Sequence, residues 1–322
     1  MRALFFDGSL HYDHQAPVPE PGEDEALIRV SMAGICGTDR EILKGYKGFT
    51  GIPGHEFVGV VERVNGAYSG LVGKRVVGEI NCGCGVCEYC SKGMDKHCPF
   101  RSALGIAGRD GVFAEYVTLP LRNLWEVPSH LQDEEIVFAE PLAAAFEITE
   151  QVHVRPTDRA IVLGDGTLGL LCAFVLKGAG ADVTLCGRHK AKLAVAAAEK
   201  IKTRKSDELK KKRAYDIVVE ATGSENGLET ALDLVRPRGT IILKSTVAAK
   251  RKVDLSGIVV DEITLVGSRC GPFAPAIAAL ASRRVPVKGL LSAVYPLGEA
   301  QAAFEKAAQA GAIKVLLDLR GG

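Results

Sequence analysis

Hydrophobic residues in the first 130 positions come in short runs separated by glycine and proline. Four of these runs are rich in valine or other apolar residues and read ALIRVSMAGICG, FVGVVERV, GKRVVGEI and AEYVTL. Short apolar runs bounded by turn-forming residues are typical of β-strands, and no long helical period lies between them. This part of the chain is therefore predicted to form an irregular β-rich domain.

Beyond residue 141, strand-like runs alternate with helix-like runs. AIVLGDG reads as a strand entering a glycine turn, DVTLCG, YDIVVEATG, GTIILKS and EITLVGS read as strands, and TLGLLCAFVLKGAG, HKAKLAVAAAEK and NGLETALDLVR read as helices. Such alternation predicts parallel βαβ units in a doubly wound sheet, so the fold class is α/β. The charged segment after Lys200 is short, and one strand–helix unit there is predicted to be trimmed. Two alanine-rich helices and a last strand, IKVLLDL, are expected at the end of the chain.

Composition agrees with a globular protein of two domains, because the chain has 322 residues and is 47% hydrophobic and 25% charged. The net charge of +1 gives no reason to expect a nucleic-acid partner. A basic run from Lys200 to Arg213 contains acidic residues as well and is interpreted as a solvated connection. No apolar stretch suits a membrane span or a signal peptide, so we expect a soluble, cytoplasmic protein that does not bind membranes.

Nine cysteines are present, and five of them fall between residues 82 and 98. In a long chain without a signal peptide, such a cluster indicates metal ligation rather than disulfides. Four of the five have the spacing C-x2-C-x2-C-x7-C, which can close a thiolate tetrahedron around a structural zinc ion: Cys84, Cys87, Cys90 and Cys98. Cys82 is expected to be unliganded, although a shift of register onto it stays open, as does a set of unliganded buried cysteines.

A second set of potential metal ligands is spread over three glycine- or proline-containing motifs. GICGTD carries Cys36 and Thr38, GHEFVG carries His55 and Glu56, and FAEPLAAA carries Glu140. One thiolate, one imidazole and one or two carboxylates match a catalytic zinc site, which keeps a position open for water or substrate. A single cysteine or histidine is more often structural, but their position in turns between strands favours a functional role.

A dinucleotide-binding loop is predicted where the first strand of the α/β region meets a helix. Gly164, Gly166 and Gly169 form GxGxxG in the required strand–turn–helix context, and the pyrophosphate would sit at the helix N-terminus. The other residues expected to contact the dinucleotide here are Thr167, Leu168, Thr222 and Gly223.

The end of the second strand bears on the choice between NAD and NADP. An enzyme that uses NAD is expected to have an acid there, but the position is Gly187, followed by Arg188, His189 and Lys192. Without a carboxylate, a 2′-phosphate meets no repulsion, and the Arg188 guanidinium can hold it. This pattern favours NADP, with NAD also possible; a basic, solvated helix start that tolerates both cofactors is the alternative.

Together these motifs resemble those of the zinc-containing medium-chain dehydrogenases/reductases over nearly the whole chain. The resemblance implies a GroES-like catalytic domain at 1–141 and 270–322, a Rossmann domain at 142–269, and an active site in the cleft. The EPL motif is more similar to sorbitol, threonine and glucose dehydrogenases than to liver-type alcohol dehydrogenases, which have cysteine there. The resemblance implies that Cys36, His55 and Glu56 bind the catalytic zinc, and that Glu140 is a fourth ligand or bonds to a zinc-bound water.

The implied reaction interconverts an alcohol, polyol or sugar and its carbonyl by hydride transfer to or from NAD(P), with one catalytic and one structural zinc per chain. Zinc lowers the pKa of a bound alcohol, and the Thr38 hydroxyl can accept and pass on its proton. Many relatives have a histidine five positions after the first cysteine, whereas this chain has Glu41. Either Glu41 replaces that histidine in the proton relay, or protons leave by another route.

Substrate and assembly are less constrained by the sequence. Arg269 follows the last Rossmann strand and suggests a polyhydroxylated or anionic substrate, although a packing or pyrophosphate contact explains it equally well. Relatives are dimers or tetramers, so a homodimer or homotetramer is expected. Two other functions remain open: a zinc-free quinone or enone reductase of the same superfamily, and a non-catalytic NADP-binding redox sensor.

Overall fold

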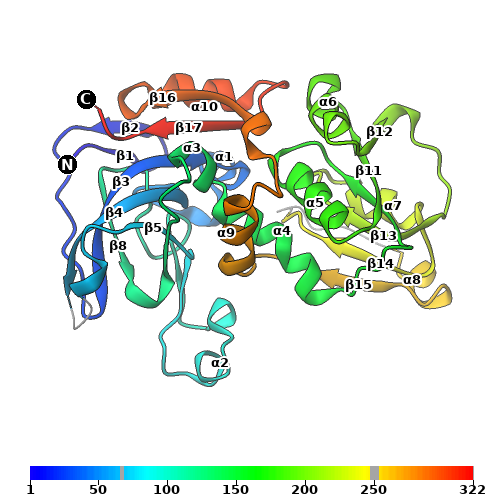
Figure 1. Cartoon of the computed structure of the whole chain (residues 1–322), viewed down its shortest axis with the longest axis horizontal. Helices are drawn as coiled ribbons and strands as arrows, with labels where there is room; N and C mark the ends of the chain where they lie inside the picture. The colour runs from blue at the N-terminus through cyan, green and yellow to red at the C-terminus, as the bar shows by residue number, and fades with distance from the viewer. Residues whose placement is uncertain (66–68, 247–253, 322) are drawn as a thin grey trace. The chain divides into compact units, whose positions relative to one another are not determined.

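The structure is a computed structural model that describes residues 1–65, 69–246 and 254–321 (Figure 1). The chain divides into two compact units. The first comprises 1–140, 280–282 and 291–322, and the second comprises 141–279 and 283–290. Residues 270–279 and 283–290 thus group with the second unit, not with the catalytic domain to which the sequence pattern assigns them. Within the described residues, no helix combines the length and the apolar character that crossing a bilayer requires.

The first unit is built on a seven-stranded sheet with the order β16-β17-β3-β4-β5-β9, and β8 pairs with β3 beside that path. β1 pairs with β2 and β6 with β7 in two small separate sheets. The strands of the first unit are β1 (Ala3–Phe6), β2 (Leu10–Asp13), β3 (Glu25–Ile35), β4 (Glu56–Asn65), β5 (Arg75–Gly78), β6 (Asn81–Cys82), β7 (Ser102–Ala103), β8 (Tyr116–Pro120), β9 (Leu124–Glu126), β16 (Leu291–Pro296) and β17 (Lys314–Asp318). Its helices are α1 (Gly37–Ile42), α2 (Glu88–Ser91), α3 (Asp133–Ile136) and α10 (Ala300–Ala308). The predicted β-rich domain is confirmed.

Three neighbouring strands of this sheet bring distant parts of the sequence together at one end of the strands. β3 and β4 are antiparallel, with Gly34 opposite Glu56, so the end of β3 lies beside the beginning of β4. β17 pairs with the other side of β3, with Val315 opposite Ile35. The residue after β3, the first residues of β4 and the first residue of β17 therefore meet.

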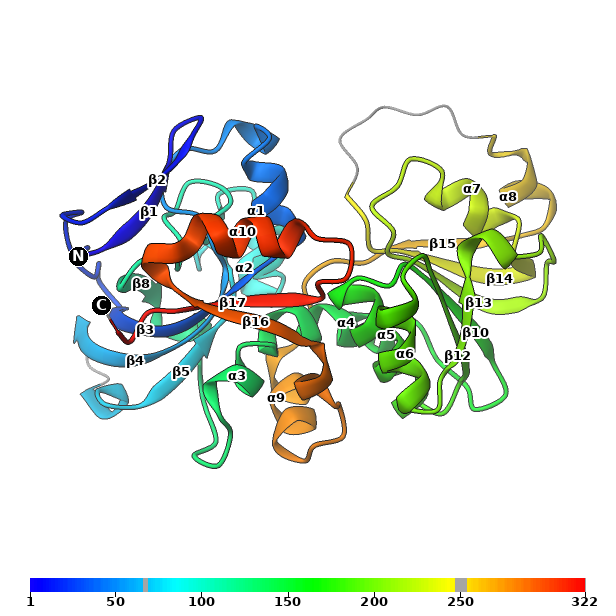
Figure 2. The same cartoon turned by 90° about the horizontal axis from the view of Figure 1, so that it is seen from above.

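The second unit is a parallel six-stranded sheet with the order β12-β11-β10-β13-β14-β15. Its strands are β10 (Arg159–Leu163), β11 (Asp182–Gly187), β12 (Lys202–Lys205), β13 (Tyr215–Glu220), β14 (Val235–Leu243) and β15 (Thr264–Gly267). Its helices are α4 (Ala139–Gln151), α5 (Thr167–Gly178), α6 (Lys190–Ala198), α7 (Gly227–Leu232), α8 (Ser256–Val260) and α9 (Phe273–Ala281). Helices α5 and α6 cover one face and α7 and α8 the other, which confirms the predicted doubly wound sheet (Figure 2).

The strand–helix unit that the sequence predicts to be shortened lies between β12 and β13. β12 is present, but only a single 3-10 turn, Ser206–Glu208, follows it in place of a crossover helix. The basic residues Lys210, Lys211 and Lys212 are exposed. Lys211 forms an ion pair with Asp233 at 2.9 Å, as expected of a solvated connection.

Candidate active site

The potential catalytic ligands lie close together at the end of the sheet where β3, β4 and β17 meet. Cys36 follows β3 and forms the N-cap of α1, and its backbone N–H donates to Asp39 Oδ2 at 2.8 Å. His55 immediately precedes β4, and Glu56 is its first residue. One ligand atom from each of Cys36, His55 and Glu56 lies within 4.8 Å of the other two. A thiolate, an imidazole and a carboxylate that converge in this way fit a divalent zinc ion.

The His55 ring is oriented by a carboxylate behind it. His55 Nδ1 lies 3.1 Å from Asp39 Oδ1, and both side chains are almost fully buried. Burial alone would lower the pKa of the imidazole, but the charges of Asp39 and Cys36 outweigh it and hold that pKa well above its usual value. Because Nδ1 faces Asp39, Nε2 is left for a metal ion, which would replace the proton that the metal-free ring holds.

Glu56 is held by a buried ion pair from the last strand of the chain. Lys314 Nζ donates to Glu56 Oε2, and the two side chains are 2% and 1% exposed. A Cβ atom at Gly34 would collide with this carboxylate, so glycine is needed on the facing position of β3. Glu56 Oε1 is buried and has no hydrogen-bond partner among the described residues. An unpaired buried carboxylate oxygen is costly, and a cation at this point would satisfy it.

Two further predicted residues lie around this cluster. Thr38 Oγ1 is 3.8 Å from Cys36 Sγ, so its hydroxyl is next to the metal-ligand group. Glu140, half-buried near the start of α4, is not one of the residues whose ligand atoms converge. The pKa of the Glu140 carboxyl is raised to about 7, mainly by burial and also by the charge of Glu56, although His55 and Lys314 act to lower it. Glu41 is exposed and pairs with Lys44 at 2.8 Å.

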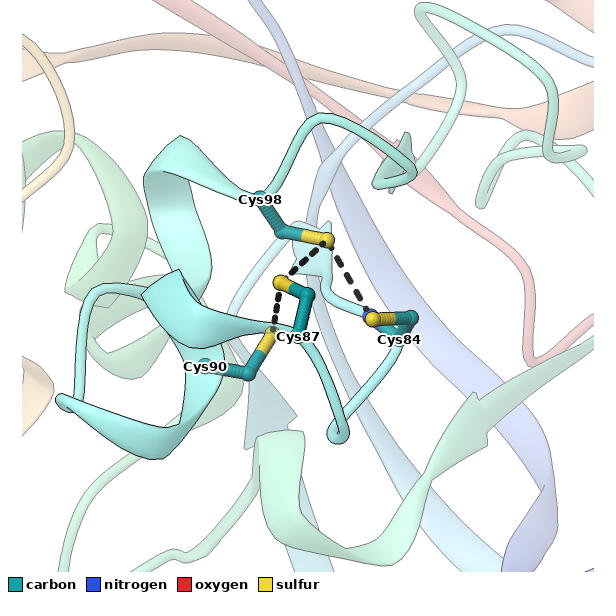
Figure 3. Close-up of side chains that lie close together, drawn as sticks. All are labelled: Cys84, Cys87, Cys90 and Cys98. Carbon is teal, nitrogen blue, oxygen red and sulfur yellow. Dashed lines mark hydrogen bonds between the residues drawn. The ribbon is translucent and has the colours of Figure 1, made fainter.

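The four-cysteine segment forms a separate lobe of the first unit, which contains α2 (cyan in Figure 1). The side chains of Cys84, Cys87, Cys90 and Cys98 point toward one another, and their sulfur atoms all lie within 4.8 Å (Figure 3). Cys87 Sγ is 3.6 Å from Cys90 Sγ and 3.7 Å from Cys98 Sγ. Thiolates at the corners of a tetrahedron around Zn²⁺, with bonds of about 2.3 Å, are about 3.8 Å apart. The cluster therefore has the dimensions of a closed zinc site.

Position, not the pKa of the thiol, distinguishes these four cysteines from Cys82, because burial also raises the pKa of Cys90, to about 12. Backbone N–H groups of Val86 and Cys87 lower the pKa of Cys84 to about 6. Cys82 is outside the cluster, and burial raises its pKa, which favours the neutral thiol. The backbone of the lobe turns at Gly85, whose φ of +80° is unfavourable for other residues. All nine cysteines are free of disulfide bonds.

The dinucleotide loop has the geometry that its sequence predicts. Gly164 has a φ of +114°, and Gly166 is the N-cap of α5. A Cβ atom on Gly169 would collide with the Gly164 carbonyl, whereas one on Gly166 would meet nothing within 4 Å. The backbone at Gly166 is therefore open to a ligand at the N-terminus of α5, where a pyrophosphate is favoured. Thr167 and Leu168 are the first two residues of α5 and are half-buried.

The NADP prediction did not take into account a carboxylate of another loop that lies next to Gly187, and the choice between NADP and NAD stays a prediction. A Cβ atom on Gly187 would lie 2.5 Å from both Cγ and Oδ2 of Asp165, the residue between the first two glycines of the loop. The space that a side chain at 187 would fill is thus already occupied by the Asp165 side chain. Arg188 is exposed, as the prediction requires, but Lys192 is 8% exposed and does not present a free cation at the surface.

The remaining predicted residues lie at the carboxyl ends of the other strands. After β13, the Thr222 hydroxyl donates to Glu220 Oε1 at 2.5 Å, and the Gly223 N–H donates to Ser245 Oγ at 2.8 Å. Arg269, after β15, is exposed, and its carbonyl accepts a hydrogen bond from Lys244 Nζ at 3.0 Å. Each of these residues stays a prediction as far as ligand contact is concerned.

Comparison with known proteins agrees with this geometry. A sequence profile described as the alcohol dehydrogenase GroES-like domain matches residues 22–129, and one described as the glucose dehydrogenase C-terminus matches residues 137–319. D-arabinitol dehydrogenase 1 of Uromyces fabae is 31% identical over 98% of this chain and 96% of its own length. The chain belongs to the zinc-type medium-chain alcohol/polyol dehydrogenases.

Solved structures of dehydrogenases have the same fold as this chain. An alcohol dehydrogenase from Escherichia coli CFT073, crystallised with NADH, has a TM-score of 0.92 and 26% identity, with 99% of each chain covered. A zinc-binding dehydrogenase from Sinorhizobium meliloti 1021, crystallised with NADP, has a TM-score of 0.89 and 28% identity, again with 99% of each chain covered. The chain is thus an NAD(P)-dependent oxidoreductase by family.

Three residues of this medium-chain dehydrogenase were not assigned a role from the sequence: Asp39, Lys314 and Asp165. Asp39 lies within the GICGTD motif and could have been recognised as a partner for a ligand. Lys314 lies between the apolar residues of AIKVLL, which indicates a buried cation, but the sequence does not show which residue pairs with it. Asp165 occupies a variable position of GxGxxG, where the residue type by itself carries no prediction.

Proposed function

We propose that this chain is a zinc-dependent dehydrogenase that interconverts an alcohol or polyol and its carbonyl by hydride transfer to or from NAD(P). The observation that carries this proposal is the convergence of Cys36, His55 and Glu56 within 4.8 Å, together with the buried, unpaired Oε1 atom of Glu56. These donors suit zinc, and a zinc-free quinone or enone reductase has no use for them. A redox sensor without catalysis would not need them either.

In the proposed active site, Cys36, His55 and Glu56 would hold the catalytic zinc, and Glu140 would be a fourth ligand or bond to a zinc-bound water. When bound, zinc supplies the Lewis-acid chemistry that lowers the pKa of an alcohol or polarises a carbonyl. Thr38 accepts the alcohol proton, because its hydroxyl is next to the ligand cluster and can both accept and donate. Asp39 fixes the His55 ring, and Lys314 neutralises the charge of Glu56.

A second zinc ion is proposed at Cys84, Cys87, Cys90 and Cys98. With four thiolates and no open position, it would stabilise the lobe rather than take part in the reaction. A reducing, cytoplasmic compartment is part of the proposal, because thiolates that bind zinc must stay reduced. A homodimer or homotetramer remains part of the proposal.

The substrate is proposed to be a small polyhydroxylated alcohol, a polyol or a sugar. The relative at 31% identity is named an arabinitol dehydrogenase, which supports this class. Arg269 would contribute a cation if the substrate were anionic. The cofactor is proposed to bind across the loop of Gly164, Gly166 and Gly169, where Arg188 favours NADP and the Asp165 carboxylate opposes it.

A substrate panel with both cofactors tests this proposal. Zinc-loaded protein is incubated with polyols, aldoses, amino alcohols and simple alcohols, and the reduction of NAD or NADP is followed. We expect turnover with at least one polyol or sugar, and its loss in Cys36→Ser. Reduction of quinones or enones that persists in Cys36→Ser, with no alcohol oxidised by the wild type, would contradict the proposal.

A further inference from the structure

One buried carboxylate of the dinucleotide loop is not explained by the proposed reaction. β10 and β11 are adjacent and parallel, with Leu163 opposite Cys186. The loop that follows β10 therefore lies beside Gly187, the last residue of β11. Asp165 belongs to this loop, and its Cγ and Oδ2 atoms are 2.5 Å from the point where a Cβ atom of residue 187 would be.

The Asp165 side chain is fixed in this position by the start of α6. Its Oδ2 accepts a hydrogen bond from the His189 backbone N–H at 2.6 Å, and His189 Nδ1 lies 3.0 Å from Oδ2 and 3.1 Å from Oδ1. Because a carboxylate only accepts, His189 Nδ1 must carry the proton. The side chain of Asp165 is 9% exposed, so it has little room to move but is not sealed from the surface.

Oδ2 accepts the short backbone hydrogen bond, whereas Oδ1 contacts only His189 among the residues that the structure describes. An ionised carboxylate has about four lone-pair positions, so Oδ1 can accept from another donor. In Rossmann folds, the adenosine ribose lies at the carboxyl end of the second strand, which here is β11. The adenosine ribose of NAD has two hydroxyl groups that can donate to such an oxygen.

We propose that Asp165 reads the adenosine ribose in place of an acid at residue 187 and selects against a 2′-phosphate. The carboxylate is supplied by the glycine-rich loop instead of by the second strand. This inference rests on the proposed placement of the dinucleotide at the loop.

Two cations lie near Asp165 at the carboxyl end of β11, so the preference between NADH and NADPH depends on charges of opposite sign. Arg188 follows Gly187, and Lys205 lies opposite Gly187 in β12; both are exposed. Exposed cations are screened by water and salt, whereas a carboxylate that is mostly buried is screened less. A 2′-phosphate brings close to two negative charges next to it. Wild-type protein is therefore expected to bind NADH at least as tightly as NADPH.

The experiment measures the dissociation constants of NADH and NADPH by fluorescence titration, which requires no turnover. Asp165→Asn keeps the shape of the side chain and can still accept from the His189 N–H. A charged contact is worth about ten- to a hundredfold in affinity. Asp165→Asn should therefore change the ratio of the affinity for NADPH to the affinity for NADH by at least about tenfold in favour of NADPH. Arg188→Ala should shift it in the opposite direction.

Asp182→Asn is the matched control, because Asp182 is an exposed carboxylate at the opposite end of β11, paired with Lys202. It should leave the ratio within about twofold of the wild-type value. Asp165→Ser is a second variant in case the asparagine weakens folding, and it should shift the ratio in the same direction. If both dinucleotides bind and neither Asp165 variant moves the ratio, the inference is overturned. If wild-type protein binds neither dinucleotide, the placement of the cofactor itself has failed.

Discussion

Lys314 donates a hydrogen bond to Glu56 across 258 positions of the sequence, and both side chains are almost completely buried. Burial alone would lower the pKa of Lys314, but the charge of Glu56 outweighs this effect and raises it. Lys314 also donates to the Ile35 carbonyl at 3.3 Å, at the end of β3. The last strand of the chain thereby neutralises one oxygen of Glu56 and leaves the other for a cation.

Replacement of Lys314 by methionine should destabilise the metal-free protein by about 3–5 kcal/mol at pH 7. Methionine fills a similar volume but leaves the Glu56 carboxylate buried without a counter-charge. Thermal unfolding after treatment with a chelator measures the effect. Glu56→Gln in the same chain should recover part of the loss. Lys44→Met removes an exposed partner of Glu41 and should change stability by less than about 1 kcal/mol. An unchanged unfolding temperature in Lys314→Met would show that the pair is not needed.

Zinc content should distinguish the two proposed metal sites. Native mass spectrometry is expected to find two zinc ions per chain. Cys36→Ser should lose one ion and stay folded, because its site lies at the edge of a complete sheet. Cys87→Ser should lose the other and lower the unfolding temperature, because metal binding there is local folding energy.

Cys82→Ser is the control for the zinc measurement. Cys82 is buried two residues from the four-cysteine cluster but does not belong to it. This variant should keep both ions. Only one zinc ion in wild-type protein would refute the two-site proposal.

Thr38→Val should lower kcat for alcohol oxidation by about 10²–10⁴-fold, the usual contribution of a positioned proton-transfer group. Valine has the shape of threonine but lacks the hydroxyl next to Cys36 Sγ. Thr38→Ser should recover most of the rate, and the affinity for NADH should not change in either variant. Equal rates for the valine and serine variants would exclude the hydroxyl from proton transfer.

Motifs of short range could be predicted from the sequence because their members are fixed by a single loop. The four cysteines of the lobe fall within 15 residues, and the three glycines of the dinucleotide loop fall within six. The doubly wound sheet was likewise predictable, since most of its strands and helices have an apolar pattern of their own, although β12, with the sequence KTRK, does not. β16 was missed because its residues are only partly buried and give a weak signal.

Contacts between distant segments could not be predicted in the same way. Lys314 and Glu56 meet only because β3 lies between β4 and β17 in the sheet. The absence of an acid at Gly187 was correctly recognised, but a neighbouring loop supplies the carboxylate, and a single sequence does not show which side chains share a space. The NADP prediction therefore lacks this contact and remains untested, while the zinc motifs needed no such information.

The ionisation of Glu140 gives a dependence of stability on pH in the metal-free protein. The pKa of this carboxyl is raised from 4.5 to about 7, mainly by burial. Below pH 4.5, folded and unfolded chains both hold the proton, and the shift costs nothing. As the pH rises from 4.5 to 7, the unfolded chain releases the proton while the folded chain retains it, so stability falls. Above pH 7 both are ionised, and the cost is constant at about 3.5 kcal/mol, since each of the roughly 2.5 pKa units contributes about 1.4 kcal/mol.

Glu140→Gln cannot ionise, so its advantage in stability over wild-type protein should grow between pH 4.5 and 7 and then level off. Thermal unfolding of both metal-free proteins across this range measures the difference. Glu150→Gln, on the exposed part of α4, should show no such trend.

Glu140→Gln also separates the two possible roles of Glu140 at the zinc site. If the carboxylate bonds only to a zinc-bound water, Glu140→Gln should keep the metal and turn over more slowly. A sharp loss of zinc affinity would instead make Glu140 a direct ligand, and no change in either property would remove it from the site.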